Sequence, residues 1–297
     1  MREKETHMPD YFVNRNKEIL LFSQLLSGNL VERILYFQDD SGRGKSFLLR
    51  EFQKMARVQG YFTVFIEFGQ SIIDYLDFCR DFIQCLPSWD YSNFEKTDRD
   101  YNNLQTHFQI GGGDNTTSSI DQGDRVTYKE TSLDGIAGRD NINIGVINIS
   151  ERVNDALLAE RRRKIKFEIS KAFINDCIKN KDGKVVVFLD ACEKCDLETI
   201  AWIEKWLFSA IQSQQLTNVI CVLAGRRRTL FLESKHLWSN ILITVDELTS
   251  FDYESVELYF NSKRNLPLPK EHIQAYYQLV RDDPLLMGQI ADRLMEK

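Results

Sequence analysis

The sequence predicts an α/β fold in which a parallel sheet carries helices on both faces. Strands alternate with helical segments along most of the chain, and two strands, at 185–189 and 219–224, are apolar over their whole length. Continuous apolar runs are typical of strands that are covered on both faces of a parallel sheet. The 297 residues are enough for one large or two modest domains with a hydrophobic core.

The first part of the chain supplies two of the predicted strands and a loop. Alternation of apolar runs with segments of helical period predicts strands at 33–38 and 61–68 and helices at 45–57 and 71–86. Pro87 opens a polar stretch that is rich in Asp, Asn and Ser as far as Asp100. This composition predicts a loop.

Seven of the fifteen glycines lie between residues 111 and 145. Within this region, residues 142–149 alternate Ile and Val with Asn and Gly, which is the period of a half-buried strand. Two interpretations stay open, a set of short β repeats and a poorly ordered insertion. We assign no chemistry to this segment.

The second part of the chain returns to the α/β pattern and then changes character. The predicted elements are a long helix at 151–180, a strand at 184–190, a helix at 197–212, strands at 218–224 and 241–245, and helices at 252–261, 270–280 and 284–295. The last three helices are expected to form a small subdomain beside the sheet. The predicted division is therefore a nucleotide-binding domain in two halves, 1–86 and 151–248, an insertion at 87–150 and a helical lid at 249–297.

Composition excludes several classes of protein. There are 38 Lys and Arg against 44 Asp and Glu, and the net charge of −6 disfavours a protein that mainly coats nucleic acid. The apolar runs are too short to cross a membrane, and residues 1–5 lack the apolar core of a secretory signal. The six cysteines are unevenly spaced, so we expect reduced thiols and a cytoplasmic location.

Residues 34–46 carry the most informative motif, an apolar strand followed by Asp-Asp-Ser-Gly-Arg-Gly-Lys-Ser and an amphipathic helix. This is the context of a phosphate-binding P-loop, in which glycines let backbone N–H groups surround a phosphate. Lys45 would pair with the β- and γ-phosphates, and the Ser46 hydroxyl would bind Mg²⁺. The expected nucleotide-binding residues of the loop are Ser41, Gly42, Arg43, Gly44, Lys45, Ser46 and Phe47.

Two departures qualify this motif. The pattern G-x-x-x-x-G-K-[ST] asks for glycine where the chain has Asp39. The dinucleotide fingerprint fails as well, because Phe47 stands where it needs a third glycine, so a nicotinamide or flavin fold is disfavoured.

Acidic residues at the end of the strand at 184–190 fit the same site. Asp190 ends an apolar strand that we expect to neighbour the P-loop strand, where its carboxylate can hold Mg²⁺ directly or through water. Glu193 could act as the general base toward the attacking water, or it could be an ordinary solvated glutamate.

The strand at 218–224 ends in Gly225-Arg226-Arg227-Arg228. An arginine just past a central strand can reach a γ-phosphate, and we favour Arg226 for that role. The register of the three arginines is not fixed by the sequence. A solvated or nucleic-acid-binding patch is the alternative.

Other motifs are weaker. Cys192 and Cys195 have the spacing of a zinc or redox pair, but no second pair accompanies them. The four histidines form no hydrolase constellation, and the basic run at 161–164 is expected to be a solvated helix face or a nucleic-acid contact.

Taken together, these motifs resemble those of the STAND class of P-loop ATPases, which are relatives of AAA+ proteins and include the NACHT and NB-ARC families. Residues 12–18 resemble the family's F-x-G-R-x-x-E segment, with Asn14 in place of glycine, and residues 189–195 resemble its Walker B motif, with Lys194 in place of the second acid. The Gly225-Arg226 strand end is similar to the family's sensor strand. Residues 247–256 and 283–291 are similar to the segment leading into its helical lid and to the lid's Gly-x-Pro-Leu motif, in which Pro284 would lie near the base of ADP.

The resemblance implies an ATP- or ADP-binding switch that uses Mg²⁺ and is controlled by its nucleotide. Together with the motifs it predicts slow ATP hydrolysis that governs self-association or an effector protein, often in bacterial defence or signalling. Asp39 and Lys194 favour the alternative of a module that holds nucleotide without turnover. A DNA-binding ATPase like the origin-recognition proteins is a third option, which the acidic balance weakens.

Overall fold

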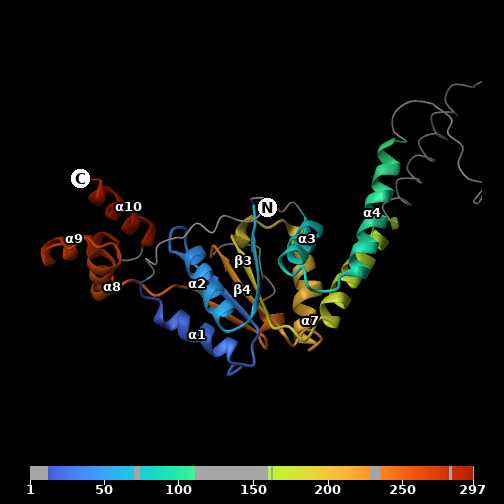
Figure 1. Cartoon of the computed structure of the whole chain (residues 1–297), viewed down its shortest axis with the longest axis horizontal. Helices are drawn as coiled ribbons and strands as arrows, with labels where there is room; N and C mark the ends of the chain where they lie inside the picture. The colour runs from blue at the N-terminus through green and yellow to red at the C-terminus, as the bar shows by residue number, and fades with distance from the viewer. Residues whose placement is uncertain are drawn as a thin grey trace, which may run out of the picture. The chain divides into compact units, whose positions relative to one another are not determined.

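The computed structural model describes residues 13–69, 74–110, 160–161, 163–227, 235–280 and 283–296. This part of the chain contains one five-stranded sheet in the order β2-β3-β4-β1-β5, with every neighbouring pair parallel (Figure 1). The strands are β1 (Ile34–Gln38), β2 (Phe62–Glu67), β3 (Val185–Asp190), β4 (Val219–Gly225) and β5 (Leu242–Val245). The predicted α/β class is therefore confirmed.

Helices connect the strands and follow the sheet. The first part of the chain forms α1 (Asn16–Leu26), α2 (Lys45–Val58), α3 (Tyr75–Cys85) and α4 (Ser92–Ile110). Residues 163–179 are helical, and the short turn η1 (Cys192–Lys194) follows β3. The predicted helix at 197–212 is a continuous stretch of α6 (Leu197–Trp202), the π-helical η2 (Ile203–Phe208) and α7 (Ser209–Gln212). The remaining elements are η3 (Lys235–Trp238), α8 (Tyr253–Leu258), the π-helical η4 (Tyr259–Lys263), α9 (Lys270–Val280) and α10 (Pro284–Met295).

The sheet order corrects one expectation about the site. The strand that ends in Asp190 was expected beside the P-loop strand, but β4 lies between β1 and β3. The carboxyl ends of β1, β4 and β3 nevertheless lie at the same height in the sheet, because Tyr36 pairs with Leu223 and Leu223 pairs with Leu189. The residues that follow β1, β3 and β4 therefore lie at one edge of the sheet.

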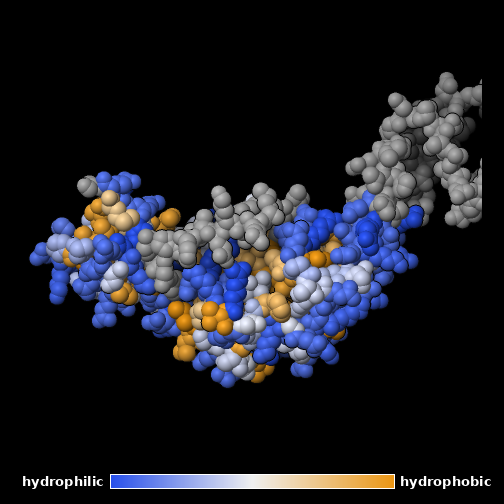
Figure 2. Space-filling model, viewed as in Figure 1, coloured by the Kyte–Doolittle hydropathy of each residue, from blue (hydrophilic) through white to orange (hydrophobic). Residues whose placement is uncertain are grey.

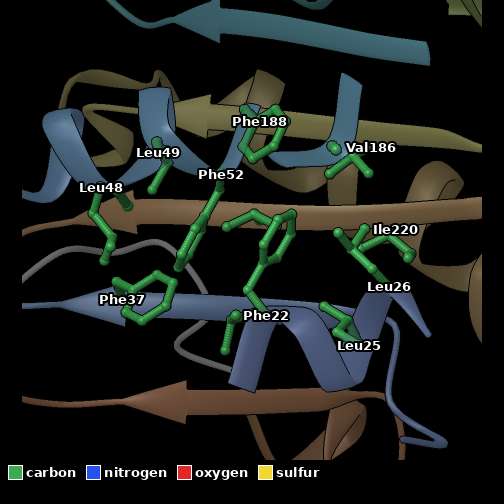
Figure 3. Close-up of a cluster of buried hydrophobic side chains, with 14 of the residues drawn as sticks. Phe22, Leu25, Leu26, Phe37, Leu48, Leu49, Phe52, Val186, Phe188 and Ile220 are labelled. Atoms are coloured by element: carbon green, nitrogen blue, oxygen red, sulfur yellow. The ribbon is translucent and has the colours of Figure 1, made fainter. Parts of the chain in front are cut away.

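Apolar side chains fix α1 and α2 on one face of the sheet. Phe22 of α1 stacks on Phe52 of α2 with ring centroids 4.2 Å apart, and both side chains are fully buried (Figure 3). In the same cluster, the ring centroid of Phe188 in β3 lies 6.1 Å from the ring centroid of Phe22. Alternate strand residues face the other side, where Tyr75 of α3 stacks on Trp202 of α6. Figure 1 shows α1 and α2 on one side of the strands and α3 and α7 on the other.

The C-terminal helices have a hydrophobic core of their own. Val256, Phe260, Ile273, Val280 and Ala291 are fully buried in it. We refer to α8 to α10 as the C-terminal subdomain because of this cluster, although they belong to the same compact unit as the sheet, and the predicted domain boundaries stay a prediction. Apolar surface is also visible on this subdomain in Figure 2, and its exposed large apolar residues are Leu258, Leu279, Leu285 and Met295.

The predicted loop at 87–100 is wrong, because α4 begins at Ser92 and runs through this stretch. The helix pairs with residues 163–176, since the rings of Tyr91 and Phe173 are stacked and Asp176 accepts a 2.9 Å hydrogen bond from the N–H of Phe94. The described residues divide into two compact units, one within 1–90 and 177–297 and one within Tyr91–Asp176.

The helix α1 (Asn16–Leu26) was not predicted from the sequence.

Two predictions fall outside the described residues. These are the β repeats or poorly ordered insertion at 111–149 and most of the helix predicted before residue 163. Among the helices that are described, none combines the length and apolar character needed to cross a membrane.

Candidate functional site

The loop between β1 and α2 has the backbone shape of an anion-binding loop. Gly42 and Gly44 have φ angles of 83° and 86°, which residues with a side chain rarely adopt. A Cβ atom on Gly44 would also lie 2.9 Å from Cγ of Pro284. The helix α2 begins at Lys45, so its unpaired N–H groups open toward the loop, where they favour an anion.

Lys45 folds back over this loop. Its Nζ donates hydrogen bonds to the backbone oxygens of Asp39 and Asp40, at 2.8 Å and 2.6 Å. Burial lowers the pKa of Lys45, while the charges of Asp39, Glu193 and Asp190 act to raise it. The ammonium therefore lies within electrostatic reach of acidic groups that come from three different positions in the sequence.

Asp190 ends β3 and is 4% exposed. Its carboxylate accepts a 2.8 Å hydrogen bond from the N–H of Ala191, and the hydroxyl of Ser46 acts to lower its pKa. Burial nevertheless raises the pKa of Asp190, helped by the nearby carboxylates of Glu67 and Glu193. The surroundings of this carboxylate are thus short of positive charge, and a divalent cation between Ser46 and Asp190 would supply it.

The backbone turns sharply after Asp190. Ala191 has a φ of 54°, which is uncommon for a residue with a side chain and costs conformational energy. The turn leads into η1, which carries Glu193. Oε1 of Glu193 forms a 3.2 Å ion pair with Nε of Arg226, while Oε2 is buried and accepts no hydrogen bond from the residues that the structure describes.

The adjacent arginines after β4 have different partners. Arg226 is paired with Glu193, and its side chain is 57% exposed. Arg227 instead pairs with Asp39 at 3.1 Å and with Glu247 at 3.0 Å. Of these two residues, Arg226 is therefore the one on the side of Asp190 and Lys45. Arg228 lies outside the described residues.

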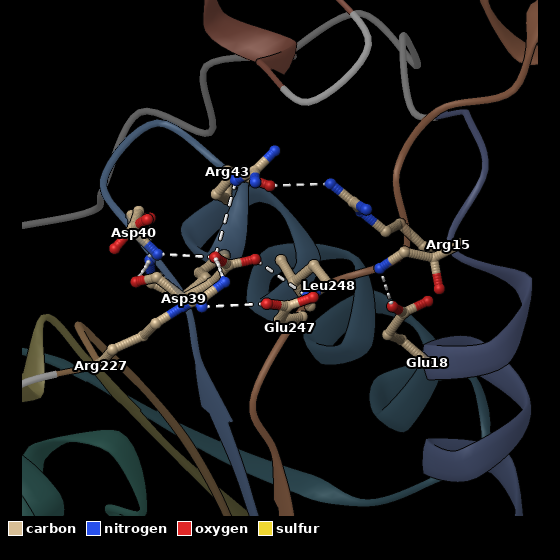
Figure 4. Close-up of polar contacts among 10 residues, drawn as sticks. Arg15, Glu18, Asp39, Asp40, Arg43, Arg227, Glu247 and Leu248 are labelled. Carbon is tan, nitrogen blue, oxygen red and sulfur yellow. Dashed lines mark hydrogen bonds and ion pairs between the residues drawn. The ribbon is translucent and has the colours of Figure 1, made fainter.

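Asp39, which stands where the P-loop pattern asks for glycine, is only 1% exposed (Figure 4). Its carboxylate accepts hydrogen bonds from the N–H groups of Asp40 and Leu248, at 2.7 Å and 2.9 Å, as well as from Arg227. Burial opposes ionisation, but these bonds and the charge of Arg43 outweigh it and lower the pKa of Asp39. The residue is therefore a fully bonded buried anion.

The N-terminal segment joins the loop to the C-terminal subdomain. Asn14 and Arg15 have φ angles of 65° and 73°, and Asn tolerates this region better than most residues, which explains how it can stand in place of a glycine. Arg15 donates a 2.8 Å hydrogen bond to the backbone oxygen of Arg43, and its guanidinium lies over the ring of Phe251. Glu18, 3% exposed, accepts a 2.7 Å hydrogen bond from the N–H of Thr249.

The first residues of α10 lie against the loop. Asp283 caps this helix by accepting a 2.9 Å hydrogen bond from the N–H of Leu286. A Cβ atom on Gly42 would lie 3.6 Å from Oδ1 of Asp283, and Pro284 contacts the position of Gly44. The lid motif and the P-loop glycines are therefore in direct contact.

The remaining candidate motifs do not assemble into a site. Burial raises the pKa of the Cys192 and Cys195 thiols, so neither is activated. All six cysteines are free, and the described residues contain no cluster of three or more His, Cys, Asp or Glu that could hold a metal ion by itself. The stem of Lys194 packs over the turn after β2, where a Cβ atom on Gly69 would lie 2.5 Å from Cδ of Lys194.

Most of the sequence-predicted site residues lie at one edge of the sheet. The group in electrostatic or hydrogen-bond contact consists of Lys45, Ser46, Asp190, Glu193 and Arg226. Ser41 and Phe47 are exposed, and Arg43 and Pro284 belong to the contacts around the loop. Arg15 and the bonding of Asp39 were not predicted, and Arg227 was predicted only as one of three arginines whose register the sequence leaves open. Arg15 had a signal, because it lies in the N-terminal motif.

Comparison with known proteins identifies the fold. No family model matches the chain, and no curated protein matches it. A solved structure of Cdc6p from Pyrobaculum aerophilum matches with a TM-score of 0.50 and 9% identity, over 96% of this chain and 59% of that one. AMPPCP-bound DnaA from Aquifex aeolicus matches with a TM-score of 0.47 and 15% identity, over 96% and 63%.

A replication initiator DnaA bound to AMPPCP and single-stranded DNA has a TM-score of 0.47 and 14% identity, over 96% of this chain and 63% of that one. The chain thus spans about three fifths of the length of these structures. At such low identity the likeness to Cdc6p extends to the fold alone, a five-stranded parallel sheet with helices, which is the predicted P-loop NTPase fold.

Proposed function

We propose that the chain binds ATP and Mg²⁺ and hydrolyses the nucleotide slowly, as a switch of the STAND kind. The observation that carries the proposal is that the Ser46 hydroxyl, the buried Asp190 carboxylate and the Lys45 ammonium interact electrostatically at the loop. A hydroxyl and a carboxylate that meet at a glycine-rich loop are the protein ligands expected for a metal-bound triphosphate.

Each charged group has a role in this proposal. The loop glycines and Lys45 would hold the β- and γ-phosphates, and Mg²⁺ would take Ser46 and Asp190 as ligands and its other ligands from phosphate and water. Glu193 would be the general base, and Arg226 would contact the γ-phosphate. Pro284 would lie near the nucleotide base, as the STAND resemblance implies.

The switch part of the proposal is supported by the contact between the lid and the loop. Pro284 and Asp283 lie against Gly44 and Gly42, so a nucleotide in the loop would change the surroundings of α10. A change in the subdomain would then control self-association or an effector protein. The six free cysteines, four of which are buried, fit the cytoplasmic location that we propose for this switch.

The test is to measure ADP and ATP binding with Mg²⁺, together with steady-state phosphate release, for the native protein and Lys45→Ala. Loss of a hydrogen-bonded charge is expected to weaken binding by roughly 10- to 100-fold. Lys54→Ala is the matched control, because Lys54 lies on the same helix but is exposed and paired with Glu51. Unchanged binding in Lys45→Ala would overturn the proposal.

A second candidate is a module that holds nucleotide without hydrolysis. The ion pair between Glu193 and Arg226 favours it, because the proposed base and the proposed phosphate contact neutralise each other. Tight nucleotide binding without phosphate release above background would establish this second candidate. Phosphate release that Glu193→Gln abolishes, with binding retained, would exclude it.

DNA binding of the origin-recognition kind is the third candidate. Some of the solved structures that match this chain are described as replication initiators, and one of them is a DnaA bound to single-stranded DNA. The likeness to this chain is one of fold, so DNA binding enters here as an outcome to be tested. Salt-dependent binding of a fluorescent oligonucleotide at physiological ionic strength would support it.

A further inference from the structure

The side chain of Asp39 binds a part of the chain that lies far away in the sequence. Oδ2 accepts the hydrogen bond from the N–H of Leu248, and Oδ1 accepts the bonds from Arg227 and Asp40. Leu248 follows β5 and precedes α8, the first helix of the C-terminal subdomain. A glycine at position 39 could make none of these side-chain contacts.

The backbone of the same residue binds the loop lysine. The carbonyl oxygen of Asp39 accepts the hydrogen bond from Nζ of Lys45 at 2.8 Å, and its N–H donates to the backbone oxygen of Gly225 at the end of β4. A single residue, Asp39, therefore contacts both the lysine of the P-loop, through its backbone, and the first residues that lead into the subdomain, through its side chain.

The segment around Leu248 forms hydrogen bonds with the N-terminal segment as well as with Asp39, and the side chain of Leu248 packs in the core. Besides Asp39, Glu18 binds the N–H of Thr249, and the side chain of Asn14 donates a 2.9 Å hydrogen bond to the backbone oxygen of Ser250. Arg227 bridges Asp39 to Glu247. Figure 4 shows Asp39, Arg227 and Glu18 around Glu247 and Leu248.

We propose that Asp39 is a positioning residue that couples the phosphate loop to residues 246–250, and through them to the C-terminal subdomain. The inference rests on the proposed nucleotide binding. Bound phosphates compete with the carbonyl of Asp39 for Lys45, and they attract Arg43, whose Nε lies 3.6 Å from Oδ1 of Asp39. Occupancy of the loop therefore changes the charge balance around the carboxylate that holds Leu248.

Hydrogen exchange of backbone amides tests this coupling. The native protein is compared with Asp39→Asn, with and without Mg²⁺–ADP and Mg²⁺–AMPPCP, and exchange is followed in peptides that cover 39–46 and 246–250. Peptides from β4 serve as the reference. In the native protein, nucleotide is expected to slow exchange in both peptides, by roughly tenfold, the size expected for one hydrogen bond to a charged group.

In Asp39→Asn, nucleotide is expected to slow exchange in the loop peptide and to leave the 246–250 peptide unchanged. A residue with only a structural role would raise exchange in the absence of nucleotide but preserve the nucleotide effect on both peptides, and that result would overturn the inference. Asp74→Asn is the matched control, since Asp74 also accepts two backbone N–H bonds, at the start of α3.

A second variant keeps the test open if Asp39→Asn fails to fold. Arg227→Gln removes a partly exposed partner and leaves Asp39 in place, and it is expected to reduce the nucleotide effect on residues 246–250 by more than half. Arg80→Gln is its control, because Arg80 pairs with Asp77 in similar exposure on α3. If the native protein binds no nucleotide, the proposed function fails; if it binds and both variants keep the coupling, the inference alone fails.

Discussion

Two buried carboxylates, Asp39 and Asp190, lie near Lys45 at the carboxyl edge of the sheet. They are 1% and 4% exposed, and both interact electrostatically with the lysine. Their pKa values nevertheless shift in opposite directions. The pKa of Asp39 is lowered despite burial, because two N–H groups and Arg227 bind its oxygens, whereas burial raises the pKa of Asp190.

The difference separates a carboxylate that the protein satisfies from one that it does not. Asp39 takes its compensation from the loop, the end of β4 and the residues after β5, so its charge contributes to holding the fold. Asp190 has the hydroxyl of Ser46 and one N–H, and the neighbouring carboxylates Glu67 and Glu193 oppose its ionisation. A carboxylate in this condition gains most from a bound cation.

The largest expected effect comes from Asp190→Asn. Loss of the proposed metal ligand should weaken Mg²⁺-dependent nucleotide binding by at least the roughly 10- to 100-fold that disturbed metal sites lose. The free protein should unfold at the same urea concentration or a higher one, because a neutral side chain removes a buried charge that is poorly compensated. Titration with nucleotide, with and without Mg²⁺, and urea denaturation measure the two effects. Unaltered Mg²⁺ dependence would contradict the assignment of Asp190.

Asp39→Asn should affect stability in the opposite direction. The amide keeps one acceptor oxygen but loses the charge that binds Arg227 and the N–H of Leu248, so the free energy of unfolding at pH 7 should fall by about 1.5–3 kcal/mol. Urea denaturation of the free protein measures this change. If the variant is as stable as the native protein, the free-energy cost of burying the Asp39 charge equals the stabilisation that its hydrogen bonds and ion pair provide.

The two variants should also differ in their pH dependence. The folded pKa of Asp39 lies below its unfolded value of about 4, so the stability that its charge contributes is present above that value and is lost as the pH falls through the folded pKa. The folded pKa of Asp190 lies above its unfolded value, so its charge costs stability at neutral pH and protonation removes the cost.

As the pH is lowered, the two differences in unfolding free energy should therefore disappear one after the other. The difference in unfolding free energy between the native protein and Asp190→Asn should disappear first, at a pH above about 4, and the difference for Asp39→Asn should disappear below it. Denaturant titrations from pH 7 to pH 3 follow both differences. Loss of both in the same pH range would contradict the opposite pKa shifts.

The sequence predicted the sheet well because its central strands are apolar throughout. β1, β3 and β4 are completely buried, and their continuous Ile, Val, Leu and Phe residues fit no other element of that length. α4 was missed because its residues favour loops locally. Its helical structure depends on contacts with residues more than 70 positions away, such as Phe173 and Asp176.

The residues of the candidate site also differ in whether the local sequence is enough to predict them. Lys45 and Ser46 could be predicted as candidate site residues because the loop motif is local, and Asp190 because it ends a strand. Asp39 looked like a defect in the motif, since nothing near it in the sequence indicates Arg227 or Leu248 as partners. The sequence also cannot show which of Arg226 and Arg227 pairs with Glu193 and which with Asp39. That depends on the direction in which each side chain points after the strand ends.

The smallest expected effect distinguishes these arginines. Arg226→Gln should change the free energy of unfolding by less than about 1 kcal/mol, because its ion pair with Glu193 is partly exposed and exposed pairs contribute little. Arg227→Gln should lower stability more, because it withdraws a guanidinium from the buried carboxylate of Asp39. If Arg226 contacts the γ-phosphate, its variant should weaken binding of AMPPCP more than that of ADP, whereas Arg227→Gln should affect both equally. Equal stability losses with equal nucleotide effects would show that the two arginines share one role, and the contrast between Asp39 and Asp190 would then not extend to the arginines beside them.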